Sequence, residues 1–218
     1  MTIETKRLRL RPWREEDAQS LYAYAKDPDV GPAAGWPVHT SVDNSRDIIR
    51  NVLSAPQTYA VCLKEDDRAV GSIGLKLGDA TDMTDRCDEC ELGYWLGKPF
   101  WGKGIIPEAA QALIDYGFRQ LGMRAIWCGY YDGNEKSRRA MEKCGFVHHH
   151  TTQNVDVPLL GETRTGHATL LTHDRWKKVK LFLAQKQTLD TFLGNGAITG
   201  AQYAKSLGDL REKMDMFL

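Results

Sequence analysis

Hydrophobic and polar residues alternate with two different periods along the chain, and the order of these periods predicts a mixed α/β domain. A period of two residues, typical of β-strands, is found at about residues 6–11, 58–64, 69–77, 89–97, 125–130, 147–155 and 164–171. A spacing of three and four residues indicates helices that begin near Ala18, Thr40, Ile106 and Asn134. The predicted order is one strand, two helices, three strands, a helix, a strand, a helix and two strands.

The segment 177–218 has a different pattern, which predicts a helical hairpin behind a domain formed by residues 1–176. One apolar stripe ends at the sequence Gly194-Asn195-Gly196, and Thr199 with Gln202 then forms a capping box for a second helix. The hairpin resembles short C-terminal SHOCT-like modules. Two short helices bury little apolar surface alone, so the hairpin either packs on its own domain or forms a dimer contact, and both a monomer and a homodimer stay open.

Composition limits the kinds of partner. The 218 residues include 29 basic and 29 acidic side chains, and a net charge of zero favours neither nucleic acid nor a membrane surface. The chain starts without an apolar signal segment, and no apolar run approaches the ~18 residues of a membrane-spanning helix. We therefore expect a cytoplasmic protein with no nucleic-acid or membrane partner.

Cysteine usage agrees with a reducing compartment. The chain has five cysteines, an odd number in a sequence too long to need disulfides. Cys87 and Cys90 form a Cys-x-x-Cys pair without a second pair at zinc-finger spacing. The three histidines at 148–150 offer further ligands, but adjacent residues on a strand point to opposite faces. Structural zinc is a minor alternative, and we expect free thiols and no metal.

A glycine-rich turn precedes the third predicted helix. Gly102 and Gly104 flank Lys103, so the backbone can bend tightly and approach a ligand without interference from Cβ atoms. Pro107 falls in the first turn of the helix, where its missing N–H group costs nothing. A helix that starts directly after such a turn leaves N–H groups free for phosphate oxygens. The alternative is a tight turn that holds no ligand.

Two other phosphate-binding loops do not fit this turn. A Walker A loop requires Ser or Thr after Gly-Lys, but Gly104 follows Lys103. A dinucleotide fingerprint requires a third glycine where Pro107 stands and an acidic residue at the end of the following strand, which is absent.

The segment 91–146 closely resembles the acetyl-CoA site of the GCN5-related N-acetyltransferase (GNAT) family. The sequence PFWGKG, residues 99–104, occupies the place of the family's Gln/Arg-x-x-Gly-x-Gly/Ala motif, with Pro99 where Gln or Arg is usual. The sequence NEKSRRAMEKCGF, residues 134–146, resembles the family's Asn-x-x-Ser/Ala…Lys-x-Gly-Phe block. Together with ELGYWLGKPFWGKG it resembles the branch typified by ribosomal-protein N-terminal alanine acetyltransferases. Residues from about 5 to 176 can be laid onto the family, whose fold is a mixed, mostly antiparallel sheet with flanking helices.

The resemblance implies acetyl-CoA as the acetyl donor and assigns residues to it. Backbone groups of Trp95, Leu96 and Gly97 would hold the pantetheine arm and polarise the thioester carbonyl. The pyrophosphate would lie on the turn and the start of the helix, at Gly102, Lys103, Gly104, Ile105 and Ile106. Asn134 is the expected side-chain contact to the pantetheine or the substrate, and a plain helix N-cap is its alternative role.

The resemblance also suggests catalytic and substrate-side residues. Met141 stands where many family members have a tyrosine acid, and Ser137, one helical turn earlier, is the expected hydrogen-bond donor to the departing sulfur. Glu91 on the strand is the expected base and a substrate contact, with a surface glutamate as the alternative role. Trp36 and His39 match a substrate-side segment, although a loop tryptophan can also fill a core.

These residues predict acetyl-CoA-dependent N-acetylation of a primary amine by direct transfer, since no cysteine lies in a Cys/His nucleophile motif. The branch favours a protein N-terminus as the acceptor, and the same scaffold also serves amino acids, polyamines and antibiotics. A non-catalytic acyl-CoA-binding or regulatory module is the alternative, motivated by Pro99 and by the missing tyrosine at position 141.

Overall fold

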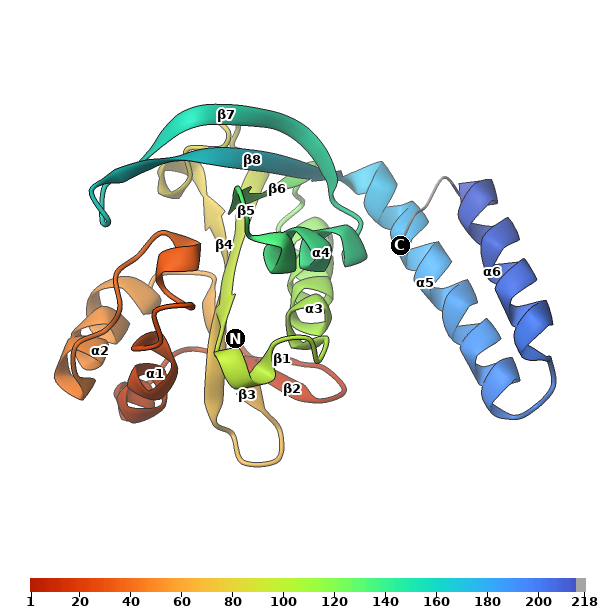
Figure 1. The fold of residues 1–218 in the computed structure, drawn as a ribbon, viewed down its shortest axis with the longest axis horizontal. Coiled ribbons are helices and arrows are strands. Elements are labelled where there is room, and N and C mark those ends of the chain that lie inside the picture. The colour runs from red at the N-terminus through yellow and green to blue at the C-terminus, as the bar shows by residue number, and fades with distance from the viewer. Residues whose placement is uncertain (215–218) are drawn as a thin grey trace.

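The computed structural model describes residues 1–214, and within them one eight-stranded sheet organises the fold (Figure 1). Its strand order is β1-β2-β3-β4-β5-β6-β8-β7. Neighbouring strands are antiparallel except β5 and β6, which are parallel. The strands are β1 (Ile3–Glu4), β2 (Leu8–Arg11), β3 (Thr58–Leu63), β4 (Ala69–Leu77), β5 (Glu89–Leu96), β6 (Ala125–Tyr131), β7 (Val147–Val157) and β8 (Glu162–Thr172).

Helices cover both faces of the sheet. The pair α1 and α2 lies on one side of β4 and β5 and the pair α3 and α4 on the other, while β7 and β8 arch over the end of the domain (Figure 1). None of the helices in residues 1–214 is long and apolar enough to cross a membrane. The helices are α1 (Ala18–Ala25), α2 (Val42–Ile48), α3 (Ile105–Arg119), α4 (Glu135–Lys143), α5 (His173–Gly194) and α6 (Gly200–Met214).

Two hydrophobic clusters hold these layers together, one on each face of the sheet. The larger cluster joins β2, β4, β5 and β6 to α3, whose side chains at Ile106, Ala109, Ala110 and Leu113 are buried. The smaller cluster joins β3 to α1 and includes Trp13 and Leu21. The predicted mixed α/β fold with a mostly antiparallel sheet is therefore confirmed.

Helix α2 begins one residue later than its sequence pattern suggested. The N-cap is Ser41, whose hydroxyl accepts a hydrogen bond from the N–H of Asn44 at 3.0 Å. The N–H of Thr40 instead donates to the side-chain oxygen of Asn44 at 3.1 Å. Ser and Thr are both favourable N-caps, with Ser the better of the two, so two neighbouring candidates left the start uncertain by one residue, and Ser41 replaces the predicted Thr40.

The helices α5 and α6 form the predicted C-terminal hairpin, which projects from the sheet (Figure 1). The predicted capping box is present, because Thr199 and Gln202 exchange side-chain hydrogen bonds with each other's backbone N–H. At the base of α5, Trp176 packs on Phe118 of α3, with ring centroids 5.0 Å apart. Farther along, a separate small cluster forms between the two helices, from Val179, Phe182, Leu207 and Leu210.

The predicted division at residue 176 falls within the first turn of α5, and it stays a prediction. Residues 215–218 of the predicted hairpin lie outside the described residues.

Candidate functional site

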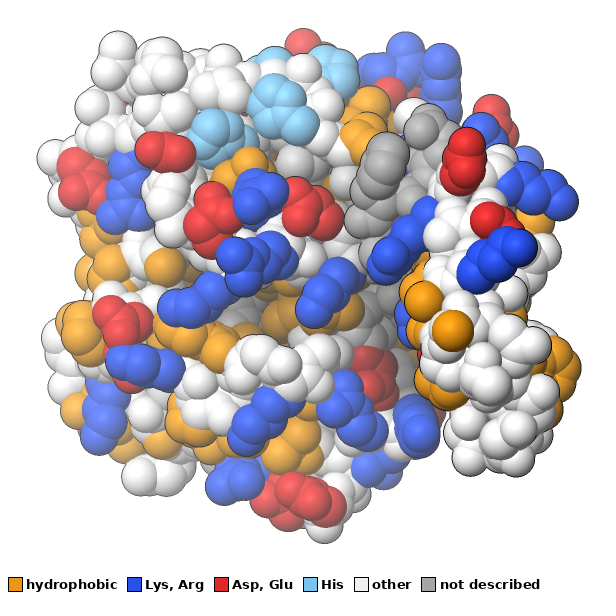
Figure 2. Space-filling view, turned by 45° about the vertical axis from the view of Figure 1, so that its right-hand side comes forward, with side chains coloured by type: hydrophobic (Ala, Val, Ile, Leu, Met, Phe, Trp, Pro, Cys, Tyr) orange, Lys and Arg blue, Asp and Glu red, His pale blue; other side chains and the backbone are white. Residues whose placement is uncertain are grey.

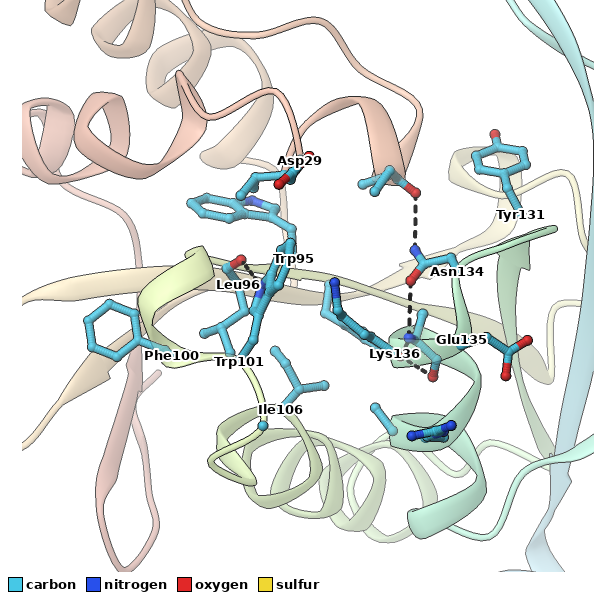
Figure 3. A pocket seen from close by; sticks show the side chains of 18 of the residues that line it. Asp29, Trp95, Leu96, Phe100, Trp101, Ile106, Tyr131, Asn134, Glu135 and Lys136 are labelled. Carbon is cyan, nitrogen blue, oxygen red and sulfur yellow. Dashed lines mark hydrogen bonds between the residues drawn. The ribbon is translucent and has the colours of Figure 1, made fainter.

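A cleft opens where β5 and β6 separate. The two strands pair only over the three partners Glu89–Ala125, Cys90–Ile126 and Glu91–Trp127. Beyond Glu91, β5 stays paired with β4 alone, while β6 pairs with β8. A cleft of about 730 Å³ occupies the gap, walled by β5, the following turn, the start of α3, the end of β6, α4 and the loop at residues 28–34 (Figure 3).

The hydrogen-bonding pattern of β5 determines which of its backbone groups are available in this gap. The N–H of Gly97 donates to the carbonyl oxygen of Val70 on β4 at 2.8 Å. In an antiparallel pair, successive residues point their peptide groups alternately toward and away from the partner strand. Leu96 therefore directs its N–H away from β4, toward the gap. Trp95, Leu96 and Gly97 were predicted to work through their backbone. Leu96 has this orientation, whereas the N–H of Trp95 points toward β4 and the N–H of Gly97 is occupied.

The turn after β5 is shaped by close contacts and by glycine. A Cβ atom on Gly97 would lie 2.8 Å from the ring of Tyr24, so only glycine fits there. The indole N–H of Trp101 donates to the carbonyl oxygen of Leu96 at 2.7 Å (Figure 3). Gly102 and Gly104 have φ angles of 76° and 71°, in the left-handed region that glycine adopts without strain.

This geometry leaves a row of free N–H groups, as the sequence predicted. Helix α3 starts at Ile105 behind Gly104, and its first backbone bond within this turn runs from Glu108 to Gly104. In the described part of the chain, no hydrogen-bond acceptor is found for the N–H groups of residues 102–106. The positive end of the helix dipole adds to these donors, so this end of the cleft favours an anion with several oxygens.

Basic side chains border the same end of the cleft. Lys136, Arg139 and Lys143 repeat at three- and four-residue spacing along α4, and all three line the cleft. The ammonium of Lys136 lies over the ring of Trp101, 4.1 Å from its centroid. Figure 2 shows Lys and Arg side chains gathered around a hollow with hydrophobic walls on this face of the molecule. Sequence reasoning missed these residues, although their helical spacing in NEKSRRAMEK was a usable signal.

Asn134 connects three parts of the cleft. Its side-chain oxygen accepts the N–H of Ser137 at 3.2 Å, which makes it the N-cap of α4. Its amide N–H donates to the carbonyl oxygen of Ala33 in the 28–34 loop at 3.2 Å (Figure 3). Both Asn134 and Ser137 line the cleft. The capping role predicted as an alternative is thus present, and a ligand contact by Asn134 stays a prediction.

Tyr94 is a cleft residue that the sequence analysis did not select. It belongs to β5, and its phenol oxygen lies 2.9 Å from the hydroxyl oxygen of Ser137 and 3.2 Å from the carbonyl oxygen of Ser137. Burial raises the pKa of Tyr94 well above its ordinary value, whereas the hydrogen bond with Ser137 lowers it. Alternation along β5 puts Tyr94 on the opposite face from Glu91, and the fold brings its phenol to α4.

Glu91 lies on the other face of β5 and does not belong to the cleft wall. One of its oxygens accepts a hydrogen bond from Lys76 and the other from Thr81, each at 2.7 Å. The neighbouring Glu89, the second carboxylate of this face, is held by Thr84 at 2.9 Å and by the indole N–H of Trp127 at 2.6 Å. The structure therefore does not bring Glu91 into contact with Ser137 or with the turn.

Trp36 and His39 lie behind the cleft rather than on its wall. The ring of Trp36 makes an edge contact with Trp95, with centroids 5.8 Å apart. His39 is 8% exposed, and its Nδ1 lies 2.8 Å from the hydroxyl of Ser45. Burial lowers the pKa of His39, which favours the neutral imidazole. Trp95 itself lines the cleft, so Trp36 is connected to the cleft through its contact with the ring of Trp95.

The cysteines are free thiols, and four of the five are buried. Burial raises the pKa of Cys62, Cys90 and Cys144 to about 12 each, so these thiols carry no thiolate at neutral pH. No group of three or more histidine, cysteine or acidic side chains in residues 1–214 is arranged to hold a metal ion.

Comparisons with known proteins show which family the chain resembles. A family model described as "Acetyltransferase (GNAT) domain" matches residues 7–147. The chain is 34% identical over 150 residues to the uncharacterized N-acetyltransferase p20 of Bacillus licheniformis, covering 66% of this chain and 82% of that protein. It is 27% identical to the ribosomal-protein-serine acetyltransferase of Escherichia coli, covering 51% of this chain and 62% of that protein.

Among solved structures, an acetyltransferase of the GNAT family from Bacillus anthracis aligns with a TM-score of 0.69 and 23% identity, covering 80% of this chain and 99% of the other. This likeness concerns the fold. The family model ends before the C-terminal hairpin, so the resemblance of the hairpin to SHOCT-like modules stays a prediction.

Proposed function

Because this chain belongs to the GNAT family of acetyltransferases, we propose that it transfers the acetyl group of acetyl-CoA directly to a primary amine. The observation that carries the proposal is the junction of two features in one cleft. The strands β5 and β6 separate at Glu91 and Trp127, and the gap between them leads to the free N–H groups of residues 102–106. A thioester arm and a pyrophosphate joined in one molecule fit this pair of features.

The residues of the cleft offer hydrogen-bond donors for two parts of acetyl-CoA, the pyrophosphate and the thioester. The N–H groups of Gly102, Lys103, Gly104, Ile105 and Ile106 are donors for the pyrophosphate oxygens. The basic residues of α4, including Lys136, Arg139 and Lys143, border the same region. The bound donor supplies an acetyl thioester, and the N–H of Leu96 is directed to the place where a backbone donor can polarise its carbonyl oxygen.

Direct transfer is the chemistry that these residues support. An acyl-enzyme would require an activated nucleophile, but burial raises the pKa of Cys62, Cys90 and Cys144 to about 12 each and that of Cys128 well above its ordinary value. Positioning two substrates in one cleft can supply about 7–11 kcal/mol of the barrier. Ser137, half-buried at the start of α4, is the proposed hydrogen-bond donor to the departing sulfur.

The proton of the acceptor amine needs a separate route. A general base acts within hydrogen-bond reach of that proton or through one water. Glu91 is held by Lys76 and Thr81 outside the cleft wall, so we propose that it accepts the proton through water. In a Glu91→Gln variant the acidic limb of the pH–rate profile is then expected to change. An unchanged profile would remove Glu91 as the base and leave solvent as the acceptor.

For the acceptor we propose a protein N-terminus. The support is the sequence similarity to the ribosomal-protein-serine acetyltransferase of Escherichia coli. On this proposal the acceptor enters the cleft beside Trp95 and the 28–34 loop, which lie next to Trp36. The contacts of Trp36 and His39 indicate that they shape this wall from behind.

The test is thiol release from acetyl-CoA with a panel of amines. The panel contains peptides that start with Ala or Ser, the same peptides with a blocked N-terminus, free amino acids, spermidine and an aminoglycoside. Release with the free peptides and none with the blocked ones is expected. Release with a small amine alone would contradict the protein acceptor but keep the enzyme. Tight binding of acetyl-CoA without release for any amine would favour a non-catalytic acyl-CoA-binding module.

A further inference from the structure

Two hydroxyl groups meet on the wall of the cleft, and the mechanism above uses only one of them. The phenol of Tyr94 on β5 lies 2.9 Å from the hydroxyl oxygen of Ser137 on α4. It also lies 3.2 Å from the carbonyl oxygen of the same serine. Both residues line the cleft. The pair therefore connects two elements of the cleft. One is β5, whose Leu96 N–H points into the gap, and the other is α4, which carries the proposed hydrogen-bond donor Ser137.

The serine is held firmly enough for this contact to matter. Its N–H donates to Asn134, and Asn134 is tied to the carbonyl oxygen of Ala33 across the cleft. One helical turn later, the side chain of Met141 is 2% exposed and packs in the main hydrophobic cluster. The backbone of Ser137 is thus fixed, and what stays free is the rotation of its hydroxyl.

The phenol has one proton and two possible acceptors on Ser137. If the phenol donates to the carbonyl oxygen, the serine hydroxyl can donate back to the phenol, and its lone pairs then face the cleft. If the phenol donates to the serine hydroxyl oxygen, the serine proton is left free to point into the cleft. Only the second arrangement offers a hydrogen-bond donor to a sulfur atom that becomes negative.

The relative pKa values of the phenol and the departing thiol decide whether Tyr94 and Ser137 transfer a proton to the sulfur or only donate a hydrogen bond to it. A free thiol has a pKa of about 8.5 and a phenol of about 10, and burial raises the pKa of Tyr94 further. Transfer of the phenol proton through Ser137 to a thiolate would therefore run uphill. Hydrogen bonds to charged groups, by contrast, are stronger than those between neutral groups.

We propose that Tyr94 is a positioning residue, whose phenol donates to the hydroxyl oxygen of Ser137 and so directs the serine proton at the departing sulfur. This inference rests on the proposed acetyl transfer. In that step the amine nitrogen forms a C–N bond with the acetyl carbon, and the C–S bond breaks with its electron pair on sulfur. The amine proton leaves to water or Glu91, and both hydroxyl protons stay in place.

The experiment compares Tyr94→Phe, Ser137→Ala and the double variant in steady-state kinetics with acetyl-CoA and the peptide that the wild-type enzyme acetylates best. Loss of one hydrogen bond to a charged group corresponds to about ten- to hundredfold in rate. Each single variant is expected to lower kcat by about this factor, with little change in the KM for acetyl-CoA. The double variant is expected to be no slower than Ser137→Ala, because Tyr94 acts through Ser137.

Tyr59→Phe is the matched control, because it removes a phenol that hydrogen-bonds Gln57 in the core, away from the cleft. It is expected to keep the wild-type kcat. Thermal unfolding of each variant separates a loss of fold from a loss of rate.

Three results would overturn the inference while the enzyme stays active. The first is an unchanged kcat in Tyr94→Phe. The second is a double variant in which the effects of Tyr94→Phe and Ser137→Ala multiply. The third is a shift of the alkaline limb of the pH–rate profile in Tyr94→Phe, which would indicate proton transfer from the phenol. A wild-type protein that releases no thiol with any amine overturns the proposed function itself, and the inference with it.

Discussion

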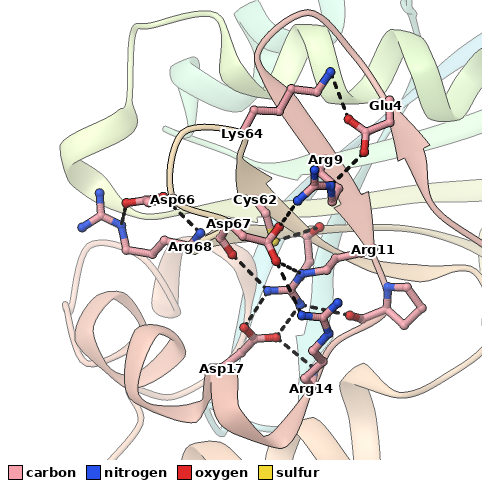
Figure 4. Close-up of polar contacts among 12 residues, drawn as sticks. Glu4, Arg9, Arg11, Arg14, Asp17, Cys62, Lys64, Asp66, Asp67 and Arg68 are labelled. Carbon is pink, nitrogen blue, oxygen red and sulfur yellow. Dashed lines mark hydrogen bonds and ion pairs between the residues drawn. The ribbon is translucent and has the colours of Figure 1, made fainter.

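Two clusters of basic side chains lie at different parts of the molecule, and they differ in what balances their charge. Around Arg11 the carboxylates are supplied by the chain itself (Figure 4). The guanidinium of Arg11 forms two bonds to Asp17, at 2.7 and 2.8 Å, and a third to Asp67 at 3.2 Å. Hydrogen bonding to Asp17 raises the pKa of Arg11, although burial opposes it.

Among residues 1–214, three basic side chains on the α4 wall of the cleft lack such a partner. Within the described residues, Lys136, Arg139 and Lys143 form no ion pair with any carboxylate. Arg138, between them on the outer side of α4, is bound by Glu135 and Glu142 at 2.6 Å each. A basic residue balanced within the fold contributes to stability, whereas a row of unbalanced ones beside free N–H groups favours an anionic ligand. Helix α4 thus carries both an ion-paired basic residue, Arg138, and three basic residues without an ion pair in the described part of the chain.

The largest effect is expected from breaking the balanced cluster. In Arg11→Met the carboxylate of Asp17 keeps its burial but loses its partner, and breaking a buried pair in this way costs about 3–5 kcal/mol. Urea unfolding measures the loss in the free energy of unfolding. Arg9→Met is the control, because Arg9 also pairs with Asp67 but is 36% exposed, and less than about 1 kcal/mol is expected. Equal losses in both variants would contradict the distinction between them.

The second effect is expected at the unbalanced cluster. Gly104→Glu introduces a carboxylate beside the free N–H groups, where it repels phosphate oxygens. Two like charges 4 Å apart near a protein surface repel by about 4 kcal/mol, so acetyl-CoA affinity is expected to fall by at least about a hundredfold. Calorimetric titration measures it.

Gly161→Glu controls for backbone strain in this experiment. Gly161 has a φ angle of 66°, close to the 71° of Gly104, and open space around it in the turn between β7 and β8. Its variant is expected to bind acetyl-CoA like the wild type. Undiminished binding by Gly104→Glu would refute the placement of the pyrophosphate.

A smaller effect separates the two kinds of residue within α4. Arg139→Gln is expected to raise the KM for acetyl-CoA by about threefold to fivefold, the size of an exposed charge contact, and less so at high salt. Arg138→Gln removes a neighbouring charge that is already bound by Glu135 and Glu142. It is expected to leave the KM unchanged. The same increase in both variants would indicate a general charge effect and not a contact with the ligand.

The sequence predicted the parts of this picture that depend on local spacing. The turn with Gly102 and Gly104, the helix behind it and the N-cap Asn134 all follow from residues close together in the chain. The mixed α/β fold followed from the two periods and their order. Local capping signals did not determine the first residue of α2, because two candidate N-caps, Thr40 and Ser41, are adjacent in the sequence.

Contacts between distant elements could not be predicted in the same way. Tyr94 and Ser137 are 43 positions apart, and only the folded chain brings the β5 residue to α4. Glu91 was selected from its place on the strand, but its bonds to Lys76 and Thr81 depend on the pairing of β4 with β5 and on the following loop. The position of Trp36 behind the cleft wall likewise depends on how the loop packs on Trp95.

The smallest effect is expected at Glu108, which lies in the first turn of α3 next to the turn with Gly102 and Gly104. Its charge is balanced by Arg7, so it resembles the cluster around Arg11. Burial raises its pKa, but hydrogen bonds from the hydroxyl of Thr5 and from the backbone and guanidinium of Arg7 lower it more, so the pKa lies below its ordinary value of 4.5. Stabilisation by a carboxylate with a lowered pKa is complete above the unfolded value and is lost as the pH falls through the folded value.

Glu108→Gln should therefore lower the free energy of unfolding at pH 7 by less than about 1 kcal/mol, since Arg7 is 46% exposed. The difference from the wild type should begin to shrink as the pH falls below 4.5, because the unfolded chain then takes up the proton, and it should vanish only below the lowered folded-state pKa of Glu108. Urea unfolding at pH 7 and at pH 3.5 measures both values, with the exposed Glu16→Gln as the control. A difference that is undiminished at pH 3.5 would assign the loss to packing, and Glu108 would then not share the charge balance seen around Arg11.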